Sequence, residues 1–292
     1  MSDKQPGAPG IPEPANAREI EYWNSPAART WSDRYEPIDR LLEGLTRKAM
    51  EFAAPAAGER VLDIGCGSGT TLLELATRVG RHGRVLGADV AQASVARARE
   101  RIGQSDLPQA DVVLADAATH VFEPGAFDLA FSRFGVMFFA DPVAAFANVR
   151  RALKPSGRLA LTVFRTPQEN RWASGPAAVI RPLVPPVPTP GPEDPGQFSW
   201  ADPARVRRIL EGAGFRDVSL TPHDPEIRLA GPGGAAQAAA FMMTVGPAVR
   251  ATQASPELTE PVRQAMETFF ASVEGPQGIV LPGGVWLIAA RA

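Results

Sequence analysis

The chain has 292 residues, of which 45% are hydrophobic and 21% charged, and this composition excludes a disordered, fibrous or disulfide-stapled protein. Its 30 basic and 32 acidic residues leave a net charge of -2, so no overall field attracts it to nucleic acid or to an anionic membrane. A single cysteine, Cys66, excludes an internal disulfide, and the three histidines lack metal-ligand spacing. We therefore expect a cytoplasmic protein, monomeric or homodimeric, without a metal, a nucleic-acid partner or a membrane anchor.

The prolines divide the chain into parts. Four of the 29 prolines fall in residues 6–14 and seven in residues 182–195, whereas residues 60–164 hold only four. Residues 1–17 lack the basic start and the apolar run of a signal peptide, so we expect a flexible tail there. The proline-rich run at 182–195 is predicted to connect two parts of the fold.

From residue 60 onward, short apolar segments alternate with segments of helical length. Strands are predicted at residues 60–64, 84–89, 111–115, 127–132, 158–164, 215–220 and 285–290. Helices are predicted at residues 70–79, 91–102, 142–153 and from 203 to Gly212 or Gly214, and the last two begin with the Asp-Pro pairs Asp141-Pro142 and Asp202-Pro203. This alternation is typical of an α/β protein in which helices cover a parallel sheet.

The C-terminal part contains an apolar helical region. Residues 229–249 carry no charge, but glycines and prolines interrupt them and leave too few helix formers to span a membrane. We expect a short buried or pocket-facing helix there, followed by an amphipathic helix near residues 262–273. Residues 231–276 are thus predicted to form a helical insertion.

The most specific motif is the segment VLDIGCGSG at residues 61–69, in which a buried strand runs into a glycine loop and then a helix. Glycines permit positive φ and let the backbone approach a ligand, while the helix N-terminus offers unpaired N–H groups. Asp89 closes the next strand, twenty residues after Gly69, where a carboxylate can accept from both hydroxyls of a ribose. For the glycine loop alone, a tight turn without a ligand is the alternative.

The glycine spacing separates two classes of cofactor site. A dinucleotide fingerprint needs glycine at the sixth position from Gly65, which is Thr70 here, and the loop instead follows Asp63. This pattern resembles the class I S-adenosylmethionine-dependent methyltransferases, particularly the small-molecule branch that includes the quinone-biosynthesis C-methyltransferases. The resemblance covers most of residues 20–292 and is specific from Val61 to Phe164. It implies a Rossmann-like, doubly wound, seven-stranded sheet, mostly parallel with the last strand antiparallel, with helical lid additions.

The resemblance also implies which residues hold S-adenosylmethionine, with S-adenosylhomocysteine as the product. In that family, the glycine loop lines the methionine part, Asp63 meets the amino group, and Asp89 holds the ribose. The residues implied for the cofactor are Asp63, Gly65, Cys66, Gly67, Gly69, Asp89, Val90, Asp116, Ala117, Ser132, Arg133, Trp31 and Tyr22. Alternatives are an exposed loop carboxylate for Asp116, a simple ion pair for Arg133 and a small filler for Cys66.

Aromatic residues concentrate before the sheet, where both tyrosines and two of the five tryptophans lie within residues 22–35. In the resembling family this segment is a lid over the cofactor, so residues 18–50 are predicted as a helical lid and residues 51–292 as the methyltransferase domain. Ordinary packing on the sheet edge is the alternative.

Residues near the methyl group are harder to assign. The candidates for the acceptor site are mostly apolar and indicate a hydrophobic or aromatic acceptor: Phe134, Met137, Trp172, Met242 and Phe269. His223 and His120 are weak candidates for a catalytic base, with a structural role as the alternative for each.

Methyl transfer from a sulfonium is an in-line displacement that mainly needs alignment and exclusion of water, so a catalytic acid or base is optional. The predicted function is methyl transfer to an O, N or C atom of a small organic acceptor. A cofactor-binding pseudoenzyme or scaffold without turnover is the alternative, and an NAD-dependent oxidoreductase is opposed by Thr70 and Asp63.

Overall fold

The computed structural model describes residues 16–184, 191 and 193–292. Most of the expected N-terminal tail and much of the proline-rich run at 182–195 therefore lie outside the described residues. Where the description begins, Asn16 is buried and Ala17 opens the first helix, so the helical segment starts one residue before the expected boundary at 18.

The elements follow one another along the chain as twelve helices and nine strands in the described residues. The helices are α1 (Ala17–Trp23), α2 (Pro26–Asp33), α3 (Tyr35–Leu41), α4 (Glu43–Ala53), α5 (Thr70–Val79), α6 (Gln92–Gly103), α7 (Pro142–Ala152), α8 (Arg171–Ile180), α9 (Pro203–Gly212), α10 (Ala235–Met242), α11 (Gly246–Ala254) and α12 (Thr259–Ser272). The strands are β1 (Arg60–Ile64), β2 (Arg84–Asp89), β3 (Ala110–Leu114), β4 (Phe127–Arg133), β5 (Leu153–Phe164), β6 (Arg216–His223), β7 (Glu226–Ala230), β8 (Ile279–Pro282) and β9 (Val285–Arg291). Short 3-10 turns lie at η1 (Val136–Phe138), η2 (Arg181–Leu183) and η3 (Pro256–Leu258).

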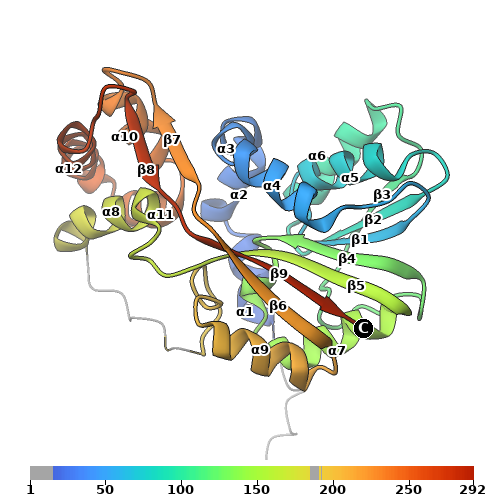
Figure 1. The fold of residues 1–292 in the computed structure, drawn as a ribbon. Helices are drawn as coiled ribbons and strands as arrows, with labels where there is room; N and C mark the ends of the chain where they lie inside the picture. The colour runs from blue at the N-terminus through green and yellow to red at the C-terminus, as the bar shows by residue number, and fades with distance from the viewer. Residues whose placement is uncertain (1–15, 185–190, 192) are drawn as a thin grey trace, which may run out of the picture.

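Seven of the strands form one sheet in the order β3-β2-β1-β4-β5-β9-β6 (Figure 1). The final strand, β9, runs antiparallel to both of its neighbours, and the other pairs are parallel. The predicted Rossmann-like sheet, mostly parallel with an antiparallel last strand, is confirmed. The largest boundary error is at β5, which begins at Leu153 rather than 158, because Leu153 already pairs with Phe127 before the register shifts.

Helices cover both faces of this sheet (Figure 1). Helices α4, α5 and α6 pack on one face, and α7 and α9 pack on the other. The two predicted Asp-Pro helix starts are confirmed, since Asp141 accepts from the backbone N–H of Ala144 at 3.0 Å and Asp202 accepts from that of Ala204 at 2.9 Å. Among the described residues, no helix combines the length and apolarity that a membrane crossing needs.

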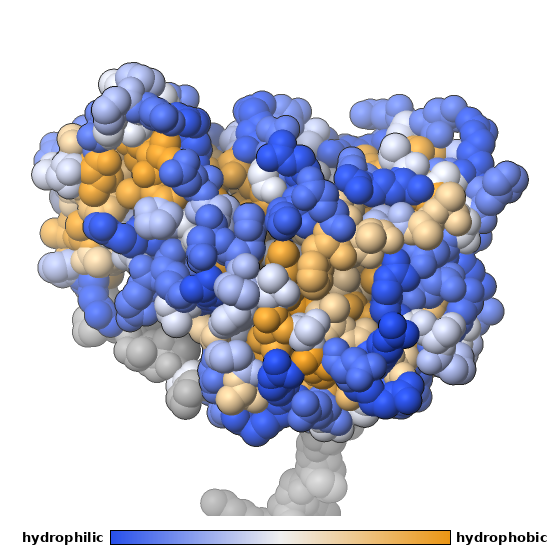
Figure 2. All heavy atoms as spheres, in the orientation of Figure 1, coloured by the Kyte–Doolittle hydropathy of each residue, from blue (hydrophilic) through white to orange (hydrophobic). Residues whose placement is uncertain are grey.

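An accessory unit, consisting of α8, α10, α11, α12 and the two-stranded β7–β8 sheet, extends from the carboxyl edge of the main sheet (Figure 1). The two short strands were not predicted, and the uncharged segment forms two helices rather than one. Gly246, at a φ of 65°, and Pro247 restart the chain as α11 after the extended Val245. Figure 2 shows apolar residues gathered over this unit and over the middle of the main sheet, on an otherwise polar face.

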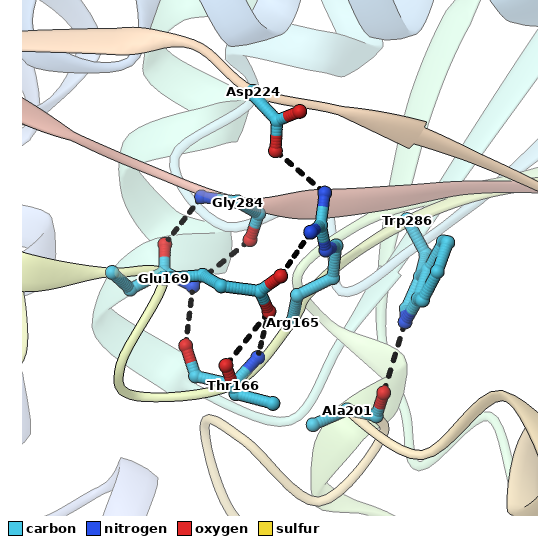
Figure 3. A network of polar contacts seen from close by, with 8 residues as sticks. Arg165, Thr166, Glu169, Ala201, Asp224, Gly284 and Trp286 are labelled. Carbon is cyan, nitrogen blue, oxygen red and sulfur yellow. Dashed lines mark hydrogen bonds and ion pairs between the residues drawn. The ribbon is translucent and has the colours of Figure 1, made fainter.

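A polar network joins the accessory unit to the main sheet (Figure 3). Arg165, which follows β5, donates to Asp224 beyond β6 at 2.6 Å, and its guanidinium lies 5.1 Å from the ring centroid of Trp286. Asn170 donates to the carbonyl of Gly284 at 2.9 Å and accepts from its N–H at 3.1 Å. The chain passes between the main sheet and the accessory unit near residues 165–170, at Asp224 and at Gly284. The side chains of Arg165 and Asn170 therefore connect these three segments by hydrogen bonds.

Candidate functional site

The glycine loop lies where the carboxyl ends of β1 and β4 meet. Gly65, Gly67 and Gly69 have φ values of 68°, 54° and 89°. A Cβ on Gly65 would come within 2.6 Å of the Cα of Gly135, which follows β4, whereas a Cβ on Gly67 would meet nothing within 4 Å. The loop therefore needs glycine for its conformation and for one close approach, and open space lies beside its middle.

Asp89 is fixed against this loop at the end of β2. Its carboxylate accepts from the backbone N–H of Gly67 at 2.8 Å and from that of Ala91 at 2.8 Å. Burial raises the pKa of Asp89, and these hydrogen bonds partly oppose the effect. The carboxylate is thus oriented beside the loop, as a ribose-binding role requires.

Asp63 lies in β1 with no solvent exposure. One carboxylate oxygen accepts from the hydroxyl of Thr71 at 2.6 Å, while the other has no hydrogen-bond partner among the residues that the structure describes. Burial raises the pKa of Asp63 to about 7, against the opposing effects of Thr71 and of the Arg133 charge. Because an unpartnered buried carboxylate oxygen is costly, it marks a candidate ligand position.

Arg133 lies at the end of β4 and meets the N-terminal helices. It donates to the hydroxyl of Thr46 on α4, and its guanidinium is 3.8 Å from Asp39 on α3. Its Nε has no hydrogen-bond partner in the described part of the chain. Burial lowers the pKa of Arg133, opposed by nearby carboxylates. The preceding Ser132 instead donates to the carbonyl of Ile64 at 2.7 Å, so its hydroxyl ties β4 to β1.

Asp116, which follows β3, is bound by the first described residue of the chain. Its carboxylate accepts from the N–H of Ala118 at 2.9 Å and from the side chain of Asn16 at 3.0 Å. The side-chain oxygen of Asn16, Oδ1, in turn accepts from the N–H of Ala140 at 2.8 Å. Ala117 is buried, with its carbonyl accepting from a side chain of α7. Asn16 therefore bridges the loops that follow β3 and β4.

A second asparagine, Asn24 after α1, binds the loop that follows β2. Its side chain donates to the carbonyl of Val90 at 2.9 Å and accepts from the N–H of Gln92 at 3.0 Å. The sequence did not reveal Asn16 or Asn24, because their partners lie far along the chain and single asparagines in a polar segment carry no motif.

Three aromatic residues of the N-terminal helices, Tyr22, Trp23 and Trp31, form an edge-to-face cluster, whereas Tyr35 lies against the guanidinium of Arg101. Trp23 lies 5.4 Å from Tyr22, 6.2 Å from Trp31 and 5.0 Å from Phe138 of η1, measured between ring centroids. The guanidinium of Arg250, on α11, lies 5.6 Å from the Tyr22 ring. The cluster thus packs between the segment after β4 and the accessory unit.

Cys66 is buried in the turn of the glycine loop. Its sulfur would lie 2.7 Å from a Cβ on Gly87 of β2, so it fills the space against that strand. Burial raises the pKa of the Cys66 thiol, and the charges of Asp89 and Asp63 raise it further. Its surroundings therefore disfavour a reactive thiolate.

Two of the predicted acceptor residues, Phe134 and Trp172, pack against Phe164 at the end of β5. Phe134 has a φ of 66°, unusual for a side chain of this size, and its ring stacks on Phe164 at 4.0 Å with an angle of 2° between the planes. Trp172 lies 5.7 Å from Phe164, and Met137 is buried. The sequence missed Phe164, although its place at the end of β5 was a usable signal.

The other predicted acceptor residues lie in the accessory unit. Met242 is buried on α10 within the apolar core. Phe269 on α12 packs directly against α8, where a Cβ on Gly175 would come 2.2 Å from its ring tip. These contacts place both side chains in the packing of the unit.

Neither of the two histidines proposed as a base, His223 and His120, stacks with Phe134 or Phe164 in the described aromatic pairs. His223 ends β6, and burial and the Lys48 charge lower its pKa, while Asp224 and Glu51 oppose this effect. His120 packs edge-on against Phe122 at 4.7 Å. In the part of the chain that the structure describes, no three acidic, His or Cys side chains gather as a metal site would require.

Known proteins are similar to this chain in both sequence and fold. A family model described as a methyltransferase domain matches residues 61–157. The nocamycin O-methyltransferase of Saccharothrix syringae is 32% identical over 192 residues, which are 63% of this chain and 69% of that protein. The chain belongs to the S-adenosylmethionine-dependent methyltransferases.

A further relative and a solved structure of similar fold extend this comparison. This chain is 38% identical over 121 residues to aklanonic acid methyltransferase DauC of Streptomyces sp. (strain C5). The matched residues are 41% of this chain and 55% of that protein. This chain also shares the fold of phosphoethanolamine N-methyltransferase 2 from Haemonchus contortus, solved with S-adenosyl-L-methionine, at a TM-score of 0.57 and 16% identity over 93% of this chain and 59% of that one. Family membership confirms the class I fold and the cofactor that the resemblance implied.

The described residues fit S-adenosylmethionine. The unpartnered oxygen of Asp63 can accept from an ammonium group, and the unpartnered Nε of Arg133 can donate to a carboxylate. The space beside Gly67 admits a ligand against the backbone of the loop. Charge and room are therefore both present at the carboxyl edge of the sheet.

Proposed function

We propose that the methyltransferase transfers a methyl group to an O, N or C atom of a small aromatic acceptor. The observation that carries this proposal is the parallel stack of Phe134 on Phe164, since Phe134 directly precedes Gly135, the residue that closely approaches Gly65. On our proposal, this stack forms a flat aromatic wall near the loop that we assign to the cofactor.

The cofactor, when bound, supplies an electrophilic methyl group on a positively charged sulfur. On our proposal, Asp63 accepts from its ammonium group and Asp89 from the ribose hydroxyls. Asp116 takes the adenine amino group at its second oxygen, which within the described residues accepts only from the Thr119 hydroxyl, at 3.5 Å. The first described residues and α1 then act as a lid, since Asn16 and Asn24 bind the loops on either side of the adenine position.

The backbone of Phe134 supports the assignment of its ring to acceptor binding. A non-glycine residue at a φ of 66° costs about 1–2 kcal/mol, and such strain gathers at functional sites. The Phe134 N–H donates to the carbonyl of Thr162 at 2.9 Å, which holds this conformation. The ring is thereby kept parallel to Phe164, in the geometry that a planar acceptor can extend by stacking.

The chemistry asks little more of the protein than position. The in-line displacement needs the acceptor atom close to the methyl carbon and aligned with the departing sulfur, with water excluded. We propose no protein base, because His223 has Lys48 and Glu51 of α4 as charged neighbours and His120 packs on Phe122. An acceptor that ionises readily, such as an acidic phenol or enol, fits this site best.

The names of the relatives support a small-molecule acceptor. One relative is named for O-methylation of nocamycin and another for methylation of aklanonic acid. We extend to this chain only the class of acceptor, a small organic molecule, and add the aromatic preference from the Phe134–Phe164 stack.

Matched acceptor pairs test this proposal. Each pair consists of a planar phenol and its ring-saturated alcohol, offered with S-adenosylmethionine that carries an isotopically labelled methyl group, and products are detected by mass. We expect label on the phenols, and a Phe164→Leu variant with a KM for the phenol raised about fivefold to tenfold through loss of stacking. Phe52→Leu, on α4, is the control. Equal labelling of the saturated alcohols would contradict the proposal.

A further inference from the structure

We propose that Asp39, on α3 of the N-terminal helices, is a cofactor ligand that accepts from the ammonium group of S-adenosylmethionine. The inference concerns cofactor binding alone and does not depend on the identity of the acceptor. It gives the N-terminal helices a direct contact with the cofactor in addition to their contacts with the loops.

Asp39 lies among charged and polar groups from three other elements. One carboxylate oxygen accepts from the hydroxyl of Thr70, the first residue of α5, and is 3.7 Å from the guanidinium of Arg101 on α6. The other oxygen is 3.8 Å from the guanidinium of Arg133 at the end of β4. All three charged side chains are largely shielded, with exposed fractions of 22% for Asp39, 21% for Arg101 and 13% for Arg133.

The set matches the amino-acid end of the cofactor, which carries one carboxylate and one ammonium group. Arg133 has an unpartnered Nε and Asp63 an unpartnered oxygen, so a donor and an acceptor are both left over inside the site. Arg101 is already engaged, since it donates to the carbonyl of Ser68 at 2.8 Å and to the hydroxyl of Thr70 at 2.9 Å. Arg133 is therefore the partner for the carboxylate, and Asp39 joins Asp63 as an acceptor for the ammonium.

The 3.8 Å separation between Asp39 and Arg133 supports this division of roles. It exceeds the range of about 2.7–2.9 Å for a charge-assisted hydrogen bond, so the two groups attract each other without a direct bond. A zwitterionic ligand can place its carboxylate against the arginine and its ammonium against the aspartate. Asp39 and Arg133 then each form a short hydrogen bond with a charged group of the ligand, in addition to their hydrogen bonds with Thr70 and Thr46.

A competing arrangement makes the opposite prediction. In that arrangement, Asp39 occupies the position beside Arg133 in the cofactor-free protein, and the cofactor carboxylate must displace the Asp39 side chain in order to bind. Neutralising Asp39 would then strengthen cofactor binding, whereas loss of an ammonium ligand weakens it. The sign of the change in affinity therefore separates the two.

The experiment measures the affinity of the full chain for S-adenosylhomocysteine and for its analogue without the amino group, by calorimetry in the absence of any acceptor. For Asp39→Asn we expect S-adenosylhomocysteine to bind about tenfold or more weakly, the effect of losing one charge-assisted hydrogen bond, with little change for the deaminated analogue. Asp33→Asn, an exposed carboxylate on α2, should change neither. Thermal unfolding without ligand checks folding, and Asp39→Ser replaces the amide variant if that one folds poorly.

Three results would overturn the proposal. Tighter binding of S-adenosylhomocysteine by Asp39→Asn would show a competing carboxylate. Equal weakening of both ligands would show that Asp39 acts through the packing of α3, and unchanged affinity for both would remove it from the site. None of these results bears on the acceptor proposal, because no acceptor is present.

Discussion

Replacing Asp63 with asparagine removes a buried charge from the centre of the candidate site. The asparagine carbonyl can still accept from the Thr71 hydroxyl, which is 2.6 Å from the carboxylate in the native protein. The substitution therefore keeps size and one hydrogen bond while removing the charge that we assign to the cofactor ammonium. We expect a cofactor-free protein that is more stable at neutral and alkaline pH but binds the cofactor poorly.

The magnitude follows from the pKa of Asp63, which burial raises from 3.8 to about 7. The folded state holds this proton more tightly than the unfolded state, so stability falls as pH rises from about 4 to about 7 and is then flat. At about 1.4 kcal/mol for each pH unit, the full range corresponds to about 4 kcal/mol. The asparagine side chain of the variant does not titrate, so the stability that the variant gains should grow over the same pH range.

Urea unfolding of the cofactor-free proteins at pH 5 and pH 8 measures this effect. The wild-type chain should lose about 3 kcal/mol more than Asp63→Asn between these pH values. In the wild type, affinity for S-adenosylhomocysteine should also increase as pH rises through 7, because the ionised carboxylate is the form that binds an ammonium group. Identical pH dependence of stability in the two proteins would refute the reasoning.

Two other substitutions test the framework of the site. Gly65→Ala places a Cβ 2.6 Å from Gly135 at a φ of 68°, so it should destabilise the protein by about 2 kcal/mol or more in urea unfolding, whereas Gly44→Ala, with open space around it, should not. Unchanged stability of Gly65→Ala would mean that the loop can move away from β4 at little cost. Arg165→Met removes the contacts to Asp224 and Trp286 and should cost about 1–2 kcal/mol in the same assay, with a raised acceptor KM and an unchanged affinity for S-adenosylhomocysteine. A matching loss of cofactor affinity would contradict the assignment of this network to the accessory unit.

The main sheet was predictable because each of its strands carries its own local signal. The C-terminal part of β1, which contains Asp63, and the glycine loop together occupy the nine consecutive residues 61–69, and Asp89 follows at a spacing that the ribose role requires. Such features depend on the order of residues along one strand and its turn. They can be recognised before any long-range contact is known.

The missed features depend on contacts between distant segments. Asn16 lies 100 residues from Asp116 along the chain, and Thr46 lies 87 residues from Arg133. The strands β7 and β8 have five and four residues and pair only with each other, so neither shows a long alternating pattern. The positive φ of Phe134 follows from packing at the end of β4, which no residue pattern encodes.

The most direct test of the cofactor site is a calorimetric titration of the wild-type chain and of Asp89→Ala with S-adenosylhomocysteine and, separately, with NAD. We predict one molecule of S-adenosylhomocysteine bound per chain, affinity weakened in Asp89→Ala by the equivalent of about 1–3 kcal/mol, and no binding of NAD. Binding of NAD without S-adenosylhomocysteine, or equal affinity of the two proteins for S-adenosylhomocysteine, would contradict the site at the glycine loop and Asp89.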